Sequence, residues 1–189
     1  MSRRRTGIIL ALMIVVVMPL SLAAQEEKIE QVKAVDWSKL AEMLPDELAG
    51  MKADEVEGGS MSMADPMNPG QTFSYSSVER TYRSGDEDDA KEITVRILDS
   101  GYNKMLLMPY MMAMEFDGPD GGMKSVEIAG QPAKQITEKD DGKIVSVQYM
   151  ILVGERLLVY LEGDENCSAE GLTKVAESLA FDKLAALVK

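Results

Sequence analysis

The segments KIVSVQYMILV (residues 143–153) and RLLVYLE (156–162), joined by Gly154-Glu155, decide the fold of this chain. Both segments are apolar runs of strand character, rich in β-branched and aromatic residues. The turn between them is too short for a crossover connection, so the two strands must be antiparallel neighbours. This hairpin predicts an antiparallel sheet at the centre of the domain.

The same pattern extends in both directions along the chain. Asp141-Gly142 is a tight turn that joins a third strand, 131–137, to the hairpin, and 123–128 reads as the strand before it. Further upstream, alternating apolar residues predict a hairpin formed by 71–83 and 92–99. The chain therefore has about six strands.

Helical patterns lie at both ends of these strands. Residues 35–48 have apolar positions at helical spacing after a capping Asp36, and a second stripe begins near Ser168. The apolar segment 102–116 is predicted to be a partly helical crossover. We expect an α+β fold with a central, mainly antiparallel sheet of about six strands flanked by N- and C-terminal helices. One domain would span 35–189, with a flexible loop at 52–70, which is rich in glycine and proline.

The N-terminus has the layout of a secretory signal. Arg3, Arg4 and Arg5 precede an uncharged apolar run, and small residues follow at 21–24. We expect residues 1–23 to be a cleaved signal peptide and 24–34 to be a polar leader, which places the protein in the periplasm or outside the cell. Retention of the segment as an anchor is the alternative, although the run is short for a membrane span. After cleavage no stable membrane insertion is expected.

Three local motifs, together with the order of the elements, resemble the PsbP-like sandwich of small exported proteins. These motifs are Leu44-Pro45-x-x-Leu48-x-Gly50, Ile128-Ala129-Gly130-Gln131-Pro132-Ala133 and Leu158-Val159-Tyr160-Leu161-Glu162-Gly163. The likeness covers roughly residues 40–185. It implies a binding or assembly role more than catalysis, and it assigns no functional residue.

Composition excludes several kinds of chemistry. The chain has no histidine, so it holds neither a Ser-His-Asp triad nor the usual zinc ligand. Its only cysteine, Cys167, has no partner for an internal disulfide. The net charge of −12 would become −15 without residues 1–23, which carry three of the 20 basic and none of the 32 acidic residues. Such a chain repels nucleic acid.

Methionine is the unusual component of this composition. Twelve of the 15 methionines lie beyond residue 23, and they cluster at Met61, Met63 and Met67 and at Met105, Met108, Met111, Met112, Met114 and Met123. On an ideal helix Met105, Met108 and Met112 fall within about 60° of arc. Three interpretations stay open: core packing, an adaptable groove for a partner, and a copper(I) or silver(I) site built from thioethers.

The function expected from the sequence is that of an exported, non-catalytic envelope protein, a binding or accessory module for an unknown envelope or extracellular protein. No catalytic residue and no cofactor are expected. The first alternative is a copper(I) or silver(I) binding protein with Met105, Met108 and Met112 as candidate ligands. The second is a hydrolase with unidentified carboxylates, because acidic residues are plentiful.

Overall fold

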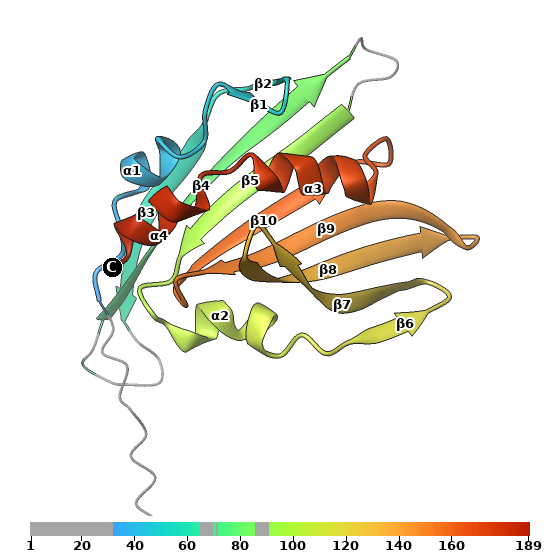
Figure 1. Ribbon diagram of the computed structural model, residues 1–189. Helices are drawn as coiled ribbons and strands as arrows, with labels where there is room; N and C mark the ends of the chain where they lie inside the picture. The colour runs from blue at the N-terminus through green and yellow to red at the C-terminus, as the bar shows by residue number, and fades with distance from the viewer. Residues whose placement is uncertain (1–31, 65–69, 71, 86–90) are drawn as a thin grey trace, which may run out of the picture.

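The computed structural model describes residues 32–64, 70, 72–85 and 91–189 (Figure 1). The predicted signal peptide and residues 24–31 of the leader lie outside this part of the chain. The described helices are α1 (Trp37–Ala41), α2 (Lys104–Met111), α3 (Ala169–Glu177) and α4 (Phe181–Leu187). The described strands are β1 (Glu47–Leu48), β2 (Met51–Ala53), β3 (Glu57–Ala64), β4 (Thr72–Ser84), β5 (Lys91–Asp99), β6 (Phe116–Gly118), β7 (Gly121–Ile128), β8 (Gln131–Asp140), β9 (Lys143–Val153) and β10 (Leu157–Gly163).

These strands form one sheet in the order β1-β2-β4-β5-β10-β9-β8-β7-β6, with β3 also paired to β4. Every pairing among them is antiparallel. The α+β class and the antiparallel sheet are therefore confirmed. The β4–β5 hairpin and the run from β7 to β10 follow the strands predicted from the sequence.

The number of strands is where the prediction was wrong, because the described sheet has ten strands and not about six. Strands β1 and β2 have two and three residues, too few for a visible pattern. Strand β6 has three residues and is equally short. Strand β3 lies in the segment 52–70, which was expected to be a loop; its Gly58-Gly59 is held in the strand by pairing with β4.

The first helix is also shorter than expected. Asp36 caps it as predicted, since its Oδ1 accepts a hydrogen bond from the Ser38 amide at 2.9 Å. The helix ends at Ala41, however, and not near Leu48. The Leu44 carbonyl accepts from Arg80 Nη1 at 2.7 Å. The chain then turns into the β1–β2 hairpin through Ala49 and Gly50, both with positive φ.

Tight turns set the register of the sheet. Asp141-Gly142 joins β8 to β9, and Ala129-Gly130 joins β7 to β8. All four residues have φ between 47° and 77°, as the favoured two-residue hairpin turns require. The Asp141-Gly142 turn is one that the sequence predicted.

The main core lies on one face of the sheet. One row of directly opposed residues crosses seven strands, and the register places in it Gly58, Val78, Ile97, Val159, Ile151, Ala133 and Val126. Leu172, Val175 and Ala176 of α3 and Leu184 of α4 belong to the same buried cluster. Ser168 caps α3 through the Gly171 amide at 3.1 Å, so this helix begins where the sequence predicted.

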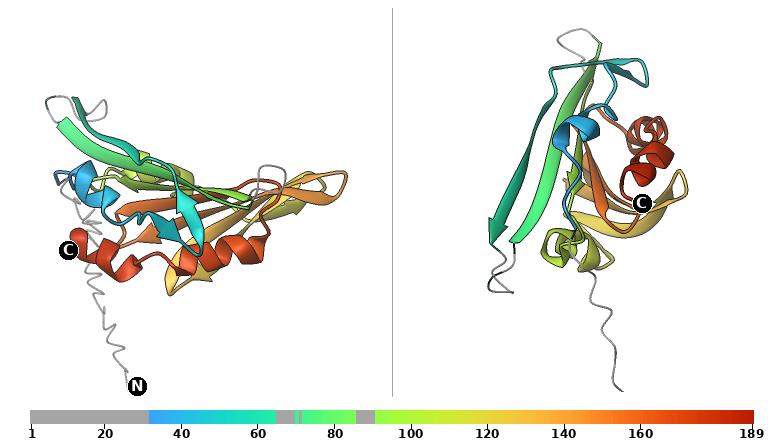
Figure 2. Two further views of the ribbon diagram at one scale, coloured as in Figure 1. Left: turned by 90° about the horizontal axis from the view of Figure 1, so that it is seen from above. Right: turned by 90° about the vertical axis from the view of Figure 1, so that its left-hand side faces the viewer.

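The helices are not spread evenly around the sheet. Figure 2 (right) shows α1, α3 and α4 on the same side of β3 and β4, and Figure 1 shows α2 apart from them, beside the end of the sheet. Four large apolar side chains, Phe73, Leu107, Met150 and Leu158, are buried outside the main cluster. Leu107, the buried residue of α2, therefore lies outside the main core.

Candidate functional site

Helix α2 carries the methionines that the sequence singled out. Asn103 starts the helix, because its side-chain oxygen accepts from the Met105 amide at 2.9 Å. Pro109 lies inside the helix, which ends two residues later at Met111. A proline at this position removes one helical hydrogen bond and limits the length of the helix. The result is a short helix in which five of eight residues are Met or Leu.

The three candidate ligands are exposed. The exposed fractions are 48% for Met105, 45% for Met108 and 67% for Met112, against 7% for Leu107. At 100° per residue on an ideal helix, Met105, Met108 and Met112 lie about 160°, 100° and 140° from Leu107 around the helix axis. The core-packing interpretation is therefore wrong for these residues, and the predicted common face is a solvent-facing one.

The exposed apolar region continues past the helix. Met111, Met114 and Phe116 are exposed as well, and no charged residue lies between Lys104 and Glu115. We call Met105, Met108, Met111, Met112, Met114 and Phe116 the methionine surface. Large exposed apolar side chains are ordinary when scattered. Six of them within twelve consecutive residues form a concentration that typically marks an interaction site.

The methionines of the second sequence cluster lie on strand β3. Met61 and Met63 are exposed and stand opposite Tyr75 and Phe73 of β4. The Tyr75 hydroxyl donates to Met61 Sδ at 3.3 Å. Met67 lies outside the described residues. Strand β3 therefore adds two further exposed thioethers, on an element distinct from α2.

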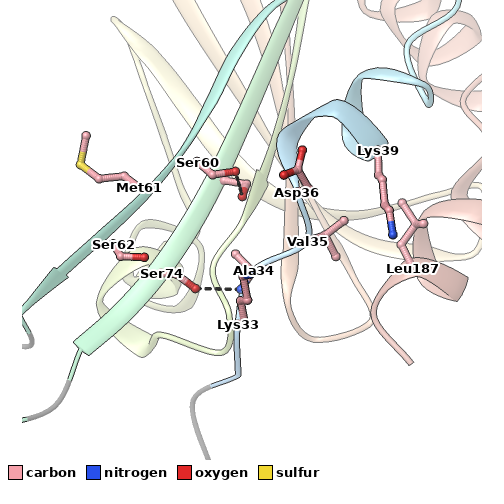
Figure 3. A pocket seen from close by; sticks show the side chains of 11 residues that line it. Lys33, Ala34, Val35, Asp36, Lys39, Ser60, Met61, Ser62, Ser74 and Leu187 are labelled. Carbon is pink, nitrogen blue, oxygen red and sulfur yellow. Dashed lines mark hydrogen bonds between the residues drawn. The ribbon is translucent and has the colours of Figure 1, made fainter.

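A pocket of about 480 Å³ opens between β3, β4 and the segment that leads into α1 (Figure 3). Ser60 and Ser76, which both line it, share a hydrogen bond of 2.7 Å, and Ser60 Oγ also accepts from the Trp37 amide at 3.2 Å. Ser74 Oγ accepts from the Ala34 amide at 2.8 Å. These hydroxyls are engaged with the protein itself, and they hold the N-terminal segment against β4.

A buried ion pair lies next to this segment. Asp99 and Arg156 bond through both carboxylate oxygens, with Arg156 Nε 2.7 Å from Oδ1. The Val35 amide donates to Asp99 Oδ2 at 2.7 Å, and the Gly101 amide donates to Oδ1 at 2.9 Å. Because both oxygens accept hydrogen bonds in this way, the Asp99 carboxylate holds the backbone at Val35 and Gly101 in position. Sequence reasoning missed the pair because its members lie 57 positions apart, at the ends of different strands.

Four carboxyl groups outside this ion pair have shifted pKa values. The pKa values of Asp36, Glu115, Asp117 and Glu170 are lowered, in each case chiefly by hydrogen bonds that the carboxylate accepts. These four carboxyls are therefore ionised at neutral pH and are not proton donors there.

The single cysteine is held as a thiol. Burial raises the pKa of Cys167 to about 11, with Asp164 as the next cause. Its Sγ donates to the Glu92 carbonyl at 3.4 Å. A thiol in this state is a poor nucleophile near neutral pH.

Among the described residues, no group of three or more His, Cys, Asp or Glu side chains is placed to hold a metal ion. In the same part of the chain, no helix is both long and apolar enough to cross a membrane.

Comparison of the chain with protein-family models, with curated proteins and with solved structures found no match. The resemblance to the PsbP-like sandwich therefore stays a prediction, and the case for a function depends on the geometry of the chain itself.

Proposed function

We propose that this is an exported, non-catalytic binding protein, and that the methionine surface is where it holds its partner. The observation that carries the proposal is the exposure of five methionines between Lys104 and Glu115, without an intervening charge, and of Phe116 directly after Glu115. Keeping such side chains in water is unfavourable, and a partner that covers them recovers that free energy.

The chemistry of the surface favours an apolar partner segment of variable shape. Methionine is unbranched and polarisable, so it adapts to different side chains better than leucine or isoleucine does. The net charge of −12 favours partners that also carry basic residues. A basic amphipathic helix meets both requirements, because one of its faces is apolar and the other cationic.

Two predictions from the sequence agree with such a role. The signal-like N-terminus predicts export from the cytoplasm, to the compartment where binding and accessory proteins of the envelope work. The PsbP-like resemblance implies binding or assembly in the same way. Neither prediction names the partner.

A peptide titration tests the proposal. The protein is expressed as the full-length chain, purified, and titrated into a labelled peptide with leucines at i, i+3, i+4 and i+7 and lysines elsewhere. Fluorescence anisotropy reports the dissociation constant. The variant M105Q/M108Q/M112Q should bind roughly 30-fold more weakly, a loss of about 2 kcal/mol.

Two controls separate this binding from simple charge attraction. A scrambled peptide of the same composition should bind weakly to the wild-type protein. The variant Ile144→Gln removes an apolar side chain of similar exposure on β9 and should leave the affinity unchanged. Equal affinity of the triple Gln variant and the wild type would contradict the proposal.

Copper(I) or silver(I) binding is the second candidate. The observation in its favour is that Met105 and Met108 of α2 and Met112, the C-cap of that helix, are all exposed and lie at spacings of three and four residues. Thioethers are soft ligands that prefer copper(I) to harder cations. Residues three and four apart on a helix are surface neighbours.

The triple Leu variant M105L/M108L/M112L distinguishes the two candidates, because leucine keeps the apolar surface and removes the sulfur. Competition for copper(I) with a chromogenic chelator measures the metal affinity. Stoichiometric binding by the wild type that the Leu variant loses would support the metal site. Equal, weak copper(I) binding by both proteins, with unchanged peptide affinity, would exclude the metal site and leave the partner surface.

A further inference from the structure

Strand β3 is a long edge strand of the described sheet. Among the described residues it pairs with β4 alone, and all eight of its residues are exposed. An edge strand presents a row of backbone N–H and C=O groups that another strand can pair with. Proteins usually protect such edges with lysine, proline, a bulge or a very short strand. Strand β3 has neither lysine nor proline.

The edge is also free of charge over most of its length. Glu57 is the only charged residue of the strand, and Gly58 to Ala64 carry none. Two copies of a chain with a net charge of −12 repel one another. The repulsion is weakest where no charged side chain is present, so a second copy can approach the sheet most closely at β3.

The sequence of the strand is nearly symmetrical about Ser62. Met61 and Met63 are its immediate neighbours, and the small residues Ser60 and Ala64 follow on either side. In an antiparallel pair centred on Ser62, Met61 of one copy would stand opposite Met63 of the other. Directly opposed residues have Cβ atoms about 5 Å apart, close enough for the methionines to pack.

We propose that two copies of this chain associate through β3, with a two-fold axis at Ser62 and the sheet continuous across both copies. Such an interface is isologous, so the same strand serves both copies and the assembly closes at two. At the opposite edge of the sheet, β6 has three residues, and the part of β7 beyond its pairing with β6 carries Lys124 and Glu127. Neither strand offers β3 a charge-free edge of matching length with which to build an open chain of copies. The four methionines would meet on the face where Tyr75 already donates to Met61.

Contacts within one copy already hold β3 in place, so the monomer folds without the dimer contact. Ser60 is tied to Ser76 at 2.7 Å and accepts from the Trp37 amide, so pairing with β4 already fixes the strand. The second copy needs no rearrangement of β3, because the outer backbone groups are in place.

Sedimentation equilibrium on the purified protein tests this, with Ser62→Lys and Ser62→Glu as the variants. Each substitution places two like charges directly opposite one another at the axis. Each should weaken dimerisation roughly 100-fold, because like charges juxtaposed in an interface cost several kcal/mol. An equal mixture of the two variants places opposite charges at the axis, one from each copy, and should restore the dimer.

The mixture also serves as the folding control, since a variant that had unfolded would not be rescued by its complement. Ile144→Lys, on β9, should leave the dimer intact. A wild-type protein that stays monomeric to millimolar concentration would overturn the proposal. A dimer that Ser62→Lys does not weaken would overturn it as well, because the contact would then lie elsewhere.

Discussion

Arg156 and Asp99 form a bidentate ion pair inside the fold, with Nε 2.7 Å from Oδ1 and Nη2 2.8 Å from Oδ2. Asp99 ends β5, and Arg156 lies in the turn before β10. The same two side chains bind the N-terminal segment, through the Val35 amide at 2.7 Å and the Lys33 carbonyl at 2.9 Å. The pair therefore joins three parts of the chain that the sequence keeps far apart.

Asp99→Asn should lower the free energy of unfolding by about 3 kcal/mol, because it leaves the Arg156 guanidinium buried without its counter-charge. Urea unfolding measures the change. The double variant D99L/R156M should be less destabilised than Asp99→Asn, because it leaves no buried charge. Glu170→Gln, which breaks the exposed pair with Lys174, serves as the control and should cause no measurable change. Similar losses in D99N and E170Q would contradict this account.

Gly58→Ala should displace Trp37, since a Cβ at position 58 would lie 2.8 Å from Trp37 Cε3 and 2.7 Å from the Ser77 carbonyl. We expect a loss of about 1–3 kcal/mol from this overpacking, together with a red shift of tryptophan fluorescence. Trp37 is the only tryptophan, so the emission reports this contact alone. Gly59→Ala is the matched control, because no atom of the described residues lies within 4 Å of its Cβ position. Equal effects of the two substitutions would show that Gly58 does not make room for Trp37.

Tyr82→Phe should stabilise the protein by about 1 kcal/mol. The Tyr82 hydroxyl is buried and has no hydrogen-bond partner among the described residues, and an unsatisfied buried group is costly. Thermal unfolding at pH 7 measures the gain. A loss of stability on this substitution would show that the hydroxyl has a partner.

Alkaline titration of the same tyrosine gives a separate test. Burial raises the pKa of Tyr82 to about 12 from 10. Above pH 10 the unfolded chain loses this proton more readily than the folded chain does. Stability from this group is therefore complete below pH 10 and is lost as the pH rises towards 12. Tyr82→Phe should remove part of the alkaline destabilisation of the wild type in urea unfolding between about pH 9 and 12. Identical pH profiles for the two proteins would exclude this contribution.

Alkylation of Cys167 should be slow in the folded protein. With a pKa of about 11, the thiolate fraction at pH 8 is roughly 100-fold below that of an ordinary cysteine, and alkylation requires the thiolate. Mass spectrometry after iodoacetamide treatment measures the rate. The urea-unfolded protein is the control and should react at the ordinary rate. Equal rates in the two states would mean that the thiol is not protected.

Local chemistry made much of the sheet predictable. Asp141-Gly142 and Ala129-Gly130 form two-residue turns with positive φ, and such turns depend on the residues within them. The apolar segments 143–153 and 157–163 are predicted to be strands, because tight hairpin turns join antiparallel strands. Ser168 capped α3 for the same local reason.

Strand β3 shows why other elements could not be predicted. Gly58-Gly59 is typical of a loop, yet the segment is extended because eight positions of β4 pair with it. A glycine at position 58 also leaves room for the indole of Trp37, 21 positions earlier. Neither contact has a sequence signal, since each depends on a segment brought in from elsewhere.

The sequence by itself determined the antiparallel hairpins, the starts of α1 and α3 and the absence of histidine chemistry. These properties follow from residue type and short spacing. Only the tertiary structure decided that Met105, Met108 and Met112 are exposed and that Asp99 meets Arg156. The physical reason is that exposure and ion pairing depend on which distant segments cover a side chain. For Leu107 of α2 a covering segment is present, and for Met105, 48% exposed, it is largely absent among the described residues.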